Sequence, residues 1–310
     1  MASLCRKDRY KAKFKDYKSN TIIIIIFIIM TMIITFKVII IVVLLTICNI
    51  VVIPIMMTMH IISFANHKGG VGKTTSTLNV AQMLARSSQR VLLLDCDAQC
   101  NLTMSFPQTT VANLGQVLQN EKTLTEVMHL VAPNLWLVNS TPHLHYLEKV
   151  IAAQFGYELL LKEALAPLAD QFDFCLLDTP PSLSALTYAA LVASQHVFIP
   201  SQPEYYGFEG LTTLLDACSR VQKHFNAGLR VGGIFFTKYS PSYRRKLHHD
   251  IVRLMKENAT LGQLVMATSI RENVSLAEAQ IQKESIHEWA PDSNGARDYE
   301  ALTNEILSLI

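Results

Sequence analysis

Residues 66–75 read Asn66-His67-Lys68-Gly69-Gly70-Val71-Gly72-Lys73-Thr74-Thr75 and constrain this 310-residue chain more than any other segment. Glycine permits positive φ angles and places no Cβ between the backbone and a ligand, so successive N–H groups can converge on phosphate oxygens. A short apolar run precedes the segment at 60–65, and a run with helical periodicity follows it at 75–86. A strand, a glycine loop and a helix in this order predict a phosphate-binding loop at a helix N-terminus.

The spacing of this loop differs from the common nucleotide-binding pattern Gly-x4-Gly-Lys-[Ser/Thr]. Its glycines lie closer together, and a second lysine, Lys68, comes before them. We expect Lys73 to neutralise the β- and γ-phosphates of a nucleotide and the hydroxyl of Thr74 to bind Mg²⁺. The residues expected to bind the nucleotide are Lys68, Gly69, Gly70, Val71, Gly72, Lys73, Thr74 and Thr75.

Two other apolar runs end in carboxylates. Residues 90–94 lead into Asp95-Cys96-Asp97, and residues 172–177 lead into Asp178. Ligands of doubly wound sheets bind beyond the carboxyl ends of the strands, so these side chains are expected beside the glycine loop. We expect Asp95 or Asp97 to hold the Mg²⁺ shell or orient the attacking water, and Asp178 to hold Mg²⁺ through water.

Runs typical of strands alternate with helical stretches from residue 59 onward. This alternation predicts one α/β domain at 59–310, with a doubly wound, mainly parallel sheet covered by helices on both faces. Helices expected at 208–225 and 297–310 carry apolar stripes for packing or for a dimer. The expected strands are 60–65, 90–95, 135–139, 173–178, 196–200, 230–237 and 263–267.

Residues 1–58 form an N-terminal extension of different composition, because residues 22–57 are almost wholly apolar with Lys37 as their only charge. One helix of that length would run about 54 Å, well beyond the ~30 Å hydrocarbon core of a bilayer. A membrane anchor also needs an even number of spans, since the basic residues 6–18 and a nucleotide-using domain both belong in the cytoplasm. We therefore favour the hypothesis that the native chain starts at Met56, Met57 or Met59 over the hypothesis that residues 22–57 are a real membrane anchor.

Charge is distributed unevenly along the chain, whose formal net charge is +2. Residues 1–58 carry eight Lys and Arg side chains and two Asp, so the remainder carries 19 basic and 23 acidic side chains. The expected α/β domain is therefore not globally basic, and net charge gives no argument for nucleic acid. The six cysteines form no Cys-x-x-Cys pair, which is typical of a reduced, cytoplasmic protein.

A local basic cluster lies between Lys238 and Lys256 and includes Arg244 and Lys246. Spacings of three and four residues place four side chains on one helix face: Arg245, His249, Arg253 and Lys256. Three apolar residues are expected on the other side: Leu247, Ile251 and Leu254. Such a face is either solvated or binds a phosphate backbone. Phosphate binding would weaken with salt, by roughly 0.9 log units per log unit for each phosphate contacted.

From about residue 59 to the C-terminus, the chain resembles ParA-type partition ATPases of the deviant Walker A group, which also contains MinD. Five blocks carry the resemblance in the family's order: 68–75, 95–99, 177–183, 270–279 and 295–302. The chain departs from the family pattern at Ala98 and Cys100, where Pro and Gly are usual, and at Ser269, where Pro is common.

The resemblance implies an ATP hydrolase that uses ATP and Mg²⁺ and closes into a nucleotide-sandwich homodimer. Lys68 would reach the phosphates bound by the other subunit, and Lys73 those of its own subunit. Asp97 would position the hydrolytic water, while Thr74 and Asp178 would hold Mg²⁺. The residues expected to contact DNA non-specifically are Arg244, Arg245, Lys246, Arg253 and Arg271.

The implied function is ATP-dependent DNA partitioning during plasmid or chromosome segregation, in the cytoplasm and on the nucleoid. Hydrolysis would be stimulated by a ParB-like centromere-binding protein and would release the DNA. A membrane is expected as a partner only if residues 22–57 are native.

Two alternatives remain open. A MinD-like, membrane-associated positioning ATPase expects an amphipathic membrane helix at the C-terminus, where residues 299–310 have few basic side chains. A membrane-anchored tyrosine autokinase with a related loop expects a C-terminal tyrosine cluster, where Tyr299 stands alone.

Overall fold

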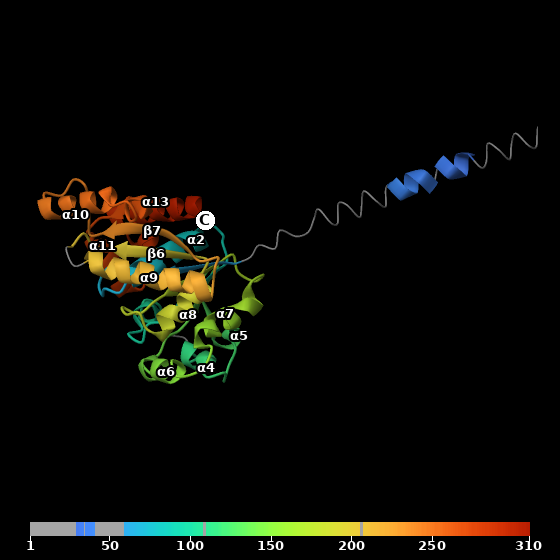
Figure 1. Cartoon of the computed structure of the whole chain (residues 1–310), viewed down its shortest axis with the longest axis horizontal. Helices are drawn as coiled ribbons and strands as arrows, with labels where there is room; N and C mark the ends of the chain where they lie inside the picture. Colours follow the sequence, from blue (N-terminus) through green and yellow to red (C-terminus); the bar gives the residue numbers. More distant parts are fainter. Residues whose placement is uncertain (1–28, 34, 41–58, 108–109, 205–206) are drawn as a thin grey trace, which may run out of the picture. The chain divides into compact units, whose positions relative to one another are not determined.

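The computed structural model describes residues 29–33, 35–40, 59–107, 110–204 and 207–310 (Figure 1). The chain divides into two compact units, Met1–Met56 and Met57–Ile310. In the first unit the described residues are helical. No helix among the described residues is long and apolar enough to cross a membrane. The hypotheses of a later start and of an anchor at 22–57 fall mostly outside the described residues and stay predictions.

An eight-stranded sheet forms the centre of the Met57–Ile310 unit, in the order β3-β4-β2-β5-β1-β6-β7-β8. Every strand pair is parallel except β3–β4, which is antiparallel. The predicted doubly wound, mainly parallel α/β fold is thereby confirmed. The strands are β1 (His60–Phe64), β2 (Val91–Asp95), β3 (His129–Ala132), β4 (Leu135–Val138), β5 (Phe174–Asp178), β6 (His196–Ser201), β7 (Arg230–Thr237) and β8 (Val265–Ile270).

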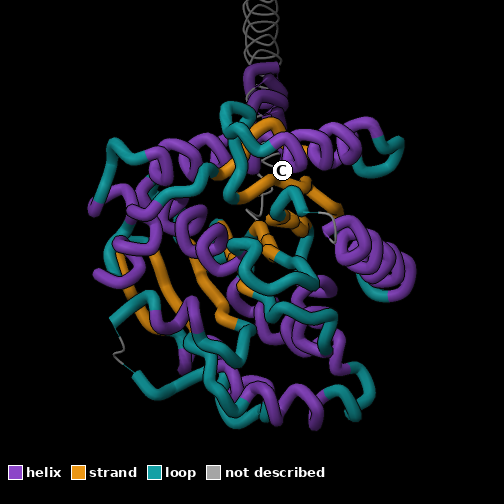
Figure 2. The backbone as a smooth tube through the Cα atoms, turned by 90° about the vertical axis from the view of Figure 1, so that its left-hand side faces the viewer, coloured by secondary structure: helices purple, strands orange, loops and turns teal. Residues whose placement is uncertain are grey.

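Helices cover both faces of this sheet (Figure 2). The α-helices are α2 (Lys73–Arg86), α3 (Asn101–Met104), α4 (Leu114–Leu118), α5 (Leu124–Val127), α6 (Leu144–Ile151), α7 (Leu160–Leu165), α8 (Ala185–Ala193), α9 (Gly207–His224), α10 (Lys246–Glu257), α11 (Val274–Gln282), α12 (Ile286–Trp289) and α13 (Asn294–Leu309). The described residues also form three short 3-10 helices: η1 (Tyr157–Leu159), η2 (Ala166–Leu168) and η3 (Gly262–Leu264).

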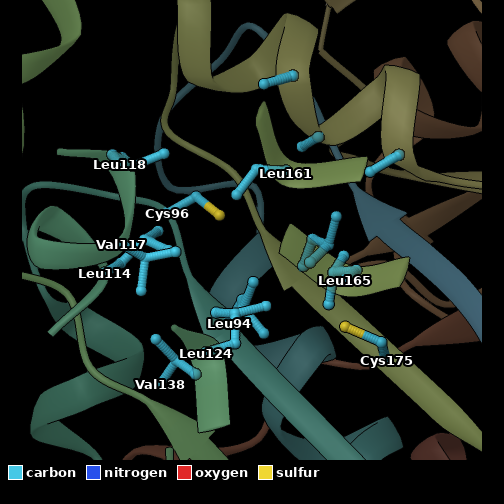
Figure 3. Close-up of a cluster of buried hydrophobic side chains, with 14 of the residues drawn as sticks. Leu94, Cys96, Leu114, Val117, Leu118, Leu124, Val138, Leu161, Leu165 and Cys175 are labelled. Carbon is cyan, nitrogen blue, oxygen red and sulfur yellow. The ribbon is translucent and has the colours of Figure 1, made fainter. Parts of the chain in front are cut away.

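The central strands are buried on both faces, which explains why they appear in the sequence as continuous apolar runs. Along β2, Leu92 and Leu94 pack with residues of α4 to α8, whereas Val91 and Leu93 pack with residues of α2 and α13. Figure 3 shows part of the hydrophobic cluster that contains Leu94, including Leu114, Leu161 and Cys175. Because β5 pairs in parallel with both β1 and β2, the carboxyl ends of these three strands lie side by side at one edge of the sheet.

Helix α13 braces the helix that follows the glycine loop. The Tyr299 hydroxyl lies 3.2 Å from the Ser76 hydroxyl on α2, and Tyr299 is only 1% exposed. A buried Tyr299 is poorly placed for phosphorylation, which weighs against the autokinase alternative.

Helix α13 begins at Asn294, three residues before the start expected at Arg297. The Ser293 side chain caps this helix by accepting a hydrogen bond from the Ala296 N–H at 3.1 Å.

Candidate functional site

The glycine loop joins β1 to α2 and borders a pocket of about 650 Å³. Gly70 and Gly72 have φ angles of 73° and 94°, in the left-handed region that residues with a Cβ avoid, whereas Gly69 does not. Gly72 is the N-cap residue of α2, so the loop leads straight into the helix N-terminus. The predicted residues lining the pocket are Gly69, Gly70, Gly72, Lys73, Thr74, Thr75 and Asp97.

Neighbouring strands hold the loop through side chains that the sequence did not reveal as site residues. Asn66 accepts a hydrogen bond from the Lys68 N–H at 3.0 Å and donates to the Pro200 carbonyl at 2.7 Å. The Gln202 side chain donates to the Gly70 carbonyl at 2.8 Å. The Thr237 hydroxyl donates to the carbonyl of the buried Val71, also at 2.8 Å. These bonds fix the loop backbone before any ligand binds.

The two lysines of the loop take different positions. Lys73 is 6% exposed, and its ammonium donates to the Lys68 carbonyl at 3.1 Å. Burial lowers the pKa of Lys73, although the negative charges of Asp178 and Asp97 oppose that effect. Lys68 lies outside the pocket lining, half-exposed, and forms an ion pair with Glu204. Lys73 therefore lines the local pocket, while Lys68 lies at the surface in an ion pair with Glu204.

The structure distinguishes the roles that the sequence left open for Asp95 and Asp97. Asp95 is fully buried and accepts hydrogen bonds from the Asp97 N–H, the Thr103 N–H and the Thr103 hydroxyl at 2.7–3.1 Å. Burial raises the pKa of Asp95 to about 6, against these hydrogen bonds, which lower it. Asp97 instead lines the pocket. Only Asp97 of this pair faces the space that a ligand would fill.

Asp178 is an unusual carboxylate, because it is fully buried and no described residue donates a hydrogen bond of ordinary geometry to its oxygens, although the Thr74 hydroxyl lies close enough to interact with them. Burial raises the pKa of Asp178 well above its usual range, and the nearby Asp95 carboxylate adds to this effect. The Thr74 hydroxyl and the Lys73 ammonium act in the opposite direction without overcoming burial. Buried carboxylates are normally paired or bind a cation, so this group fits a site for Mg²⁺ beside the loop.

A cation at this place would need ligands besides protein carboxylates. Within the described part of the chain, no three His, Cys, Asp or Glu side chains cluster closely enough to hold a metal ion. Mg²⁺ commonly takes one or two protein oxygens and completes its octahedron with phosphate oxygens and water. The combination of Thr74 and Asp178 beside a phosphate-binding loop therefore suits Mg²⁺ bound together with a nucleotide.

The outer part of the pocket is formed by residues from two distant segments. Lys238 follows β7 with a φ of 52°, and α11 contributes Ala277, Gln280 and Ile281. The Ile281 side chain is 75% exposed although it borders the pocket. Sequence reasoning missed these residues as lining residues, because nothing in their local pattern indicates that the sheet order brings them to the loop.

The basic residues expected to contact DNA are only partly brought together. Helix α10 exposes Arg244 and Arg245 just before its start, and Lys246 and Arg253 along it. The expected apolar side is only partly right, because Ile251 is buried, together with Val252 and Met255, whereas Leu247 and Leu254 are exposed. His249 is only partly exposed, because its ring contacts the Tyr239 hydroxyl at 3.1 Å.

Arg271 forms an ion pair with Asp298, and the Arg271 side chain remains 34% exposed. Its guanidinium donates to both oxygens of Asp298 on α13, at distances of 2.6–3.1 Å. The Arg271 N–H also donates to Asp298, at 2.8 Å. The pair joins the end of β8 to α13, so Arg271 has a structural contact that the sequence did not reveal. Arg245 forms a more exposed ion pair with Glu272 at 3.0 Å.

Comparison with known proteins gives consistent matches over the second unit. A family profile described as an AAA domain matches residues 59–231. The chromosome-partitioning ATPase Soj of Treponema pallidum is 37% identical over 246 residues, covering 79% of this chain and 96% of that protein. The sporulation initiation inhibitor protein Soj of Bacillus subtilis is 34% identical over 252 residues, covering 80% and 98%.

Solved structures show the same fold. Cobyrinic acid a,c-diamide synthase from Mycobacterium smegmatis, solved with ADP and magnesium, is 27% identical with a TM-score of 0.69 and covers 80% of this chain and 94% of that chain. The apo structure of Cyanothece McdA is 24% identical with a TM-score of 0.73, covering 80% and 99%, and supports the fold alone.

Proposed function

The chain belongs to the ParA/MinD-type family of partitioning ATPases, and on that premise we propose that it hydrolyses ATP within a DNA-partitioning cycle. In this cycle, ATP and Mg²⁺ bind each subunit and two subunits close face to face. The dimer then binds DNA without regard to sequence. Hydrolysis, stimulated by a ParB-like partner, releases the DNA. The observation that carries the proposal is the fully buried Asp178 carboxylate, which has no hydrogen bond of ordinary geometry and lies near the Thr74 hydroxyl and the Lys73 ammonium.

Each residue of the loop region has a task that its position supports. The N–H groups around Gly70 and Gly72 and the N-terminus of α2 would hold the phosphates. Lys73 would neutralise the β- and γ-phosphates. Thr74 would bind Mg²⁺ directly and Asp178 through water, and the ion would offset charge on the phosphates. Asp97, at the pocket wall, would orient the water that attacks the γ-phosphate.

The surface position of Lys68 supports a dimeric active state. Lys68 is not among the residues that line the local pocket; its ammonium pairs with Glu204, and the two side chains are 39% and 46% exposed. Ion pairs that exposed are worth about 0–1 kcal/mol, so a phosphate brought by a second subunit can displace Glu204 at little cost. Because its ion pair with Glu204 is weak, Lys68 could exchange this contact within its own subunit for a contact with a phosphate bound by the second subunit.

We propose that the DNA surface centres on Arg244, Lys246 and Arg253 beside and along α10. Their side chains are exposed, and Arg253 is held only by an exposed ion pair with Asp250 at 3.0 Å. Arg271 is less exposed, and its guanidinium donates to both oxygens of the more buried Asp298. The same cycle places the protein in the cytoplasm and on the nucleoid. The names of its relatives, which include chromosome-partitioning ATPases, support this placement.

The test is DNA binding by the chain, measured as fluorescence anisotropy of a random-sequence duplex with ATP, with ADP and without nucleotide. Tight binding is expected only with ATP and Mg²⁺. Replacing both Arg244 and Lys246 by Ala should weaken DNA binding. It should also make the slope of the logarithm of the binding constant against the logarithm of the salt concentration less steep, by roughly 0.9 for each phosphate that the protein no longer binds. A matched pair on other surfaces, Lys122→Ala with Lys149→Ala, removes the same charge and should leave binding near the wild-type value.

Two results would overturn the proposal. The first is DNA binding that is equal with ATP, with ADP and without nucleotide, since the cycle requires a nucleotide-dependent switch. The second is a failure to hydrolyse ATP in the presence of Mg²⁺, DNA and the cognate partner. If the two charge-matched pairs of substitutions weaken DNA binding equally, the ATP-dependent cycle still stands, but the proposal that DNA binds at α10 is refuted.

A further inference from the structure

The loop that carries Asp97 has a backbone that its own sequence does not favour. Cys100 adopts a left-handed conformation with φ of 57°, at the position where the family usually has Gly. Residues with a Cβ avoid this region, so the turn from Asp97 to Cys100 needs support from outside itself. Within the turn, the Cys100 N–H donates to the Asp97 carbonyl and the Gln99 N–H donates to the Asp97 carboxylate, both at 2.9 Å.

That outside support is a closed ring of buried hydrogen bonds. The Asp95 carboxylate accepts from the Asp97 N–H at 3.1 Å and from the Thr103 hydroxyl at 2.7 Å. The Thr103 hydroxyl in turn accepts from the Ser140 N–H at 2.8 Å. The Ser140 hydroxyl donates to the Asp97 carbonyl at 2.6 Å, which closes the ring. All four residues are buried, with at most 7% exposure.

We propose that Ser140, with Thr103 and Asp95, is a positioning residue for the Asp97 carboxylate. The ring fixes the peptide units on both sides of the Asp97 Cα, through its N–H and its carbonyl oxygen. With both fixed, the side chain leaves the backbone in one direction, toward the pocket. This inference rests on the proposed ATP hydrolysis, in which Asp97 orients the attacking water.

Ser140 acts through Asp97 and does not touch the nucleotide. Neither Ser140 nor Thr103 lines the pocket that Asp97 borders. Ser140 lies just beyond β4, whose Val138 is paired with Leu94 of β2, so the rigid sheet holds Ser140 in place. A positioning residue of this kind affects the chemical step more than it affects nucleotide affinity.

The test compares Ser140→Ala with Ser194→Ala in the full chain. Ser194 is a matched control, because it is also buried and its hydroxyl donates to a backbone carbonyl, that of Ala190 at 2.7 Å, at the far end of α8. Ser140→Ala should lower the kcat for ATP about 10- to 100-fold with less than a threefold change in KM. Ser194→Ala should change neither value. Ser140→Thr keeps the hydroxyl and should restore most of the lost rate.

A second measurement does not depend on activity. Hydrogen exchange of the nucleotide-free protein, followed by mass spectrometry, should be faster over residues 97–104 in Ser140→Ala than in the wild type. Exchange over β2 and β5 should stay unchanged.

Wild-type kcat in Ser140→Ala, or an equal loss in Ser194→Ala, would overturn the inference. If the wild-type protein hydrolyses no ATP, the proposed function fails by itself. The exchange result then decides on Ser140 alone, and unchanged exchange over 97–104 would overturn its role.

Discussion

Replacing Asp178 by Asn should make the nucleotide-free protein more stable while removing its response to Mg²⁺ and ATP. The two effects have opposite signs because the buried carboxylate is costly without a cation and useful when a cation is bound. Asn has nearly the same shape but no charge. The substitution therefore separates the electrostatic role of Asp178 from its packing role at the end of β5.

The sign of the stabilisation follows from the raised pKa of Asp178, and its size scales with that shift. Each tenfold weakening of this acid by the fold corresponds to about 1.4 kcal/mol of lost stability at a pH above the raised pKa. For a domain of this size, about 1 kcal/mol shifts Tm by roughly 2–4 °C. Asp178→Asn should therefore melt at a higher temperature than the wild type, by about 3–6 °C for each tenfold weakening.

The pH dependence has a definite sign. Because the pKa is raised in the folded state, the wild-type protein loses stability as the pH rises from the ordinary value of about 3.9 through the raised pKa. Asn does not titrate, so the advantage of Asp178→Asn should be absent below about pH 3.9 and grow as the pH increases. Melting curves recorded from about pH 4 to pH 8 measure this directly.

Melting with Mg²⁺ and ATP tests the second half of the prediction. A ligand at about 100 times its Kd stabilises a protein by about 2.7 kcal/mol, so the wild-type Tm should rise clearly, and that of Asp178→Asn should not respond to Mg²⁺. Asp292→Asn, at an exposed position, is the control and should behave as wild type. A nucleotide-free Asp178→Asn protein that melts below the wild type, or that keeps the full Mg²⁺ response, would refute the reasoning.

Three further predictions concern the loop and its neighbours. Lys73→Ala should abolish ATP binding in a calorimetric titration, since it removes the buried ammonium; an unchanged affinity would contradict the site. Glu204→Gln should free Lys68 and strengthen ATP-dependent dimerisation up to about fivefold, because an exposed ion pair is worth about 1 kcal/mol at most; sedimentation measures this, and a weaker dimer would oppose it. Arg271→Ala should lower the free energy of unfolding by about 1–2 kcal/mol, because it breaks the partly exposed pair with Asp298; urea titration checks this, and unchanged stability would show that the pair contributes nothing.

The sequence predicted the sheet well because its central strands are continuous apolar runs buried on both faces. It missed β3, a four-residue edge strand whose residues are half-buried or exposed. On α10 a helix was correctly expected, but of the three residues expected on its apolar side only Ile251 is buried, since periodicity does not say which side meets the core. Leu247 and Leu254 point to solvent, and the partly buried His249 contacts Tyr239 instead.

Some residues of the candidate site could likewise be predicted from the sequence, and others could not. The glycine loop is contiguous in sequence, so its residues and their chemistry could be predicted from one segment. Thr237 and Ser140 reach the loops around the pocket only through the order of the strands, which a single sequence does not reveal. The choice between Asp95 and Asp97 likewise depended on hydrogen bonds from Thr103, eight residues from Asp95.

The central claim is that ATP closes two copies of this chain around Lys68, and the molecular mass in solution tests it most directly. Light scattering should show the 34.7 kDa chain as a monomer with ADP and at twice that mass with ATP and Mg²⁺. Asp97→Ala, which should slow hydrolysis, keeps ATP bound during the measurement. Adding Lys68→Ala to that variant should return the mass to that of the monomer, and a dimer that forms with ATP without Lys68 would contradict the account.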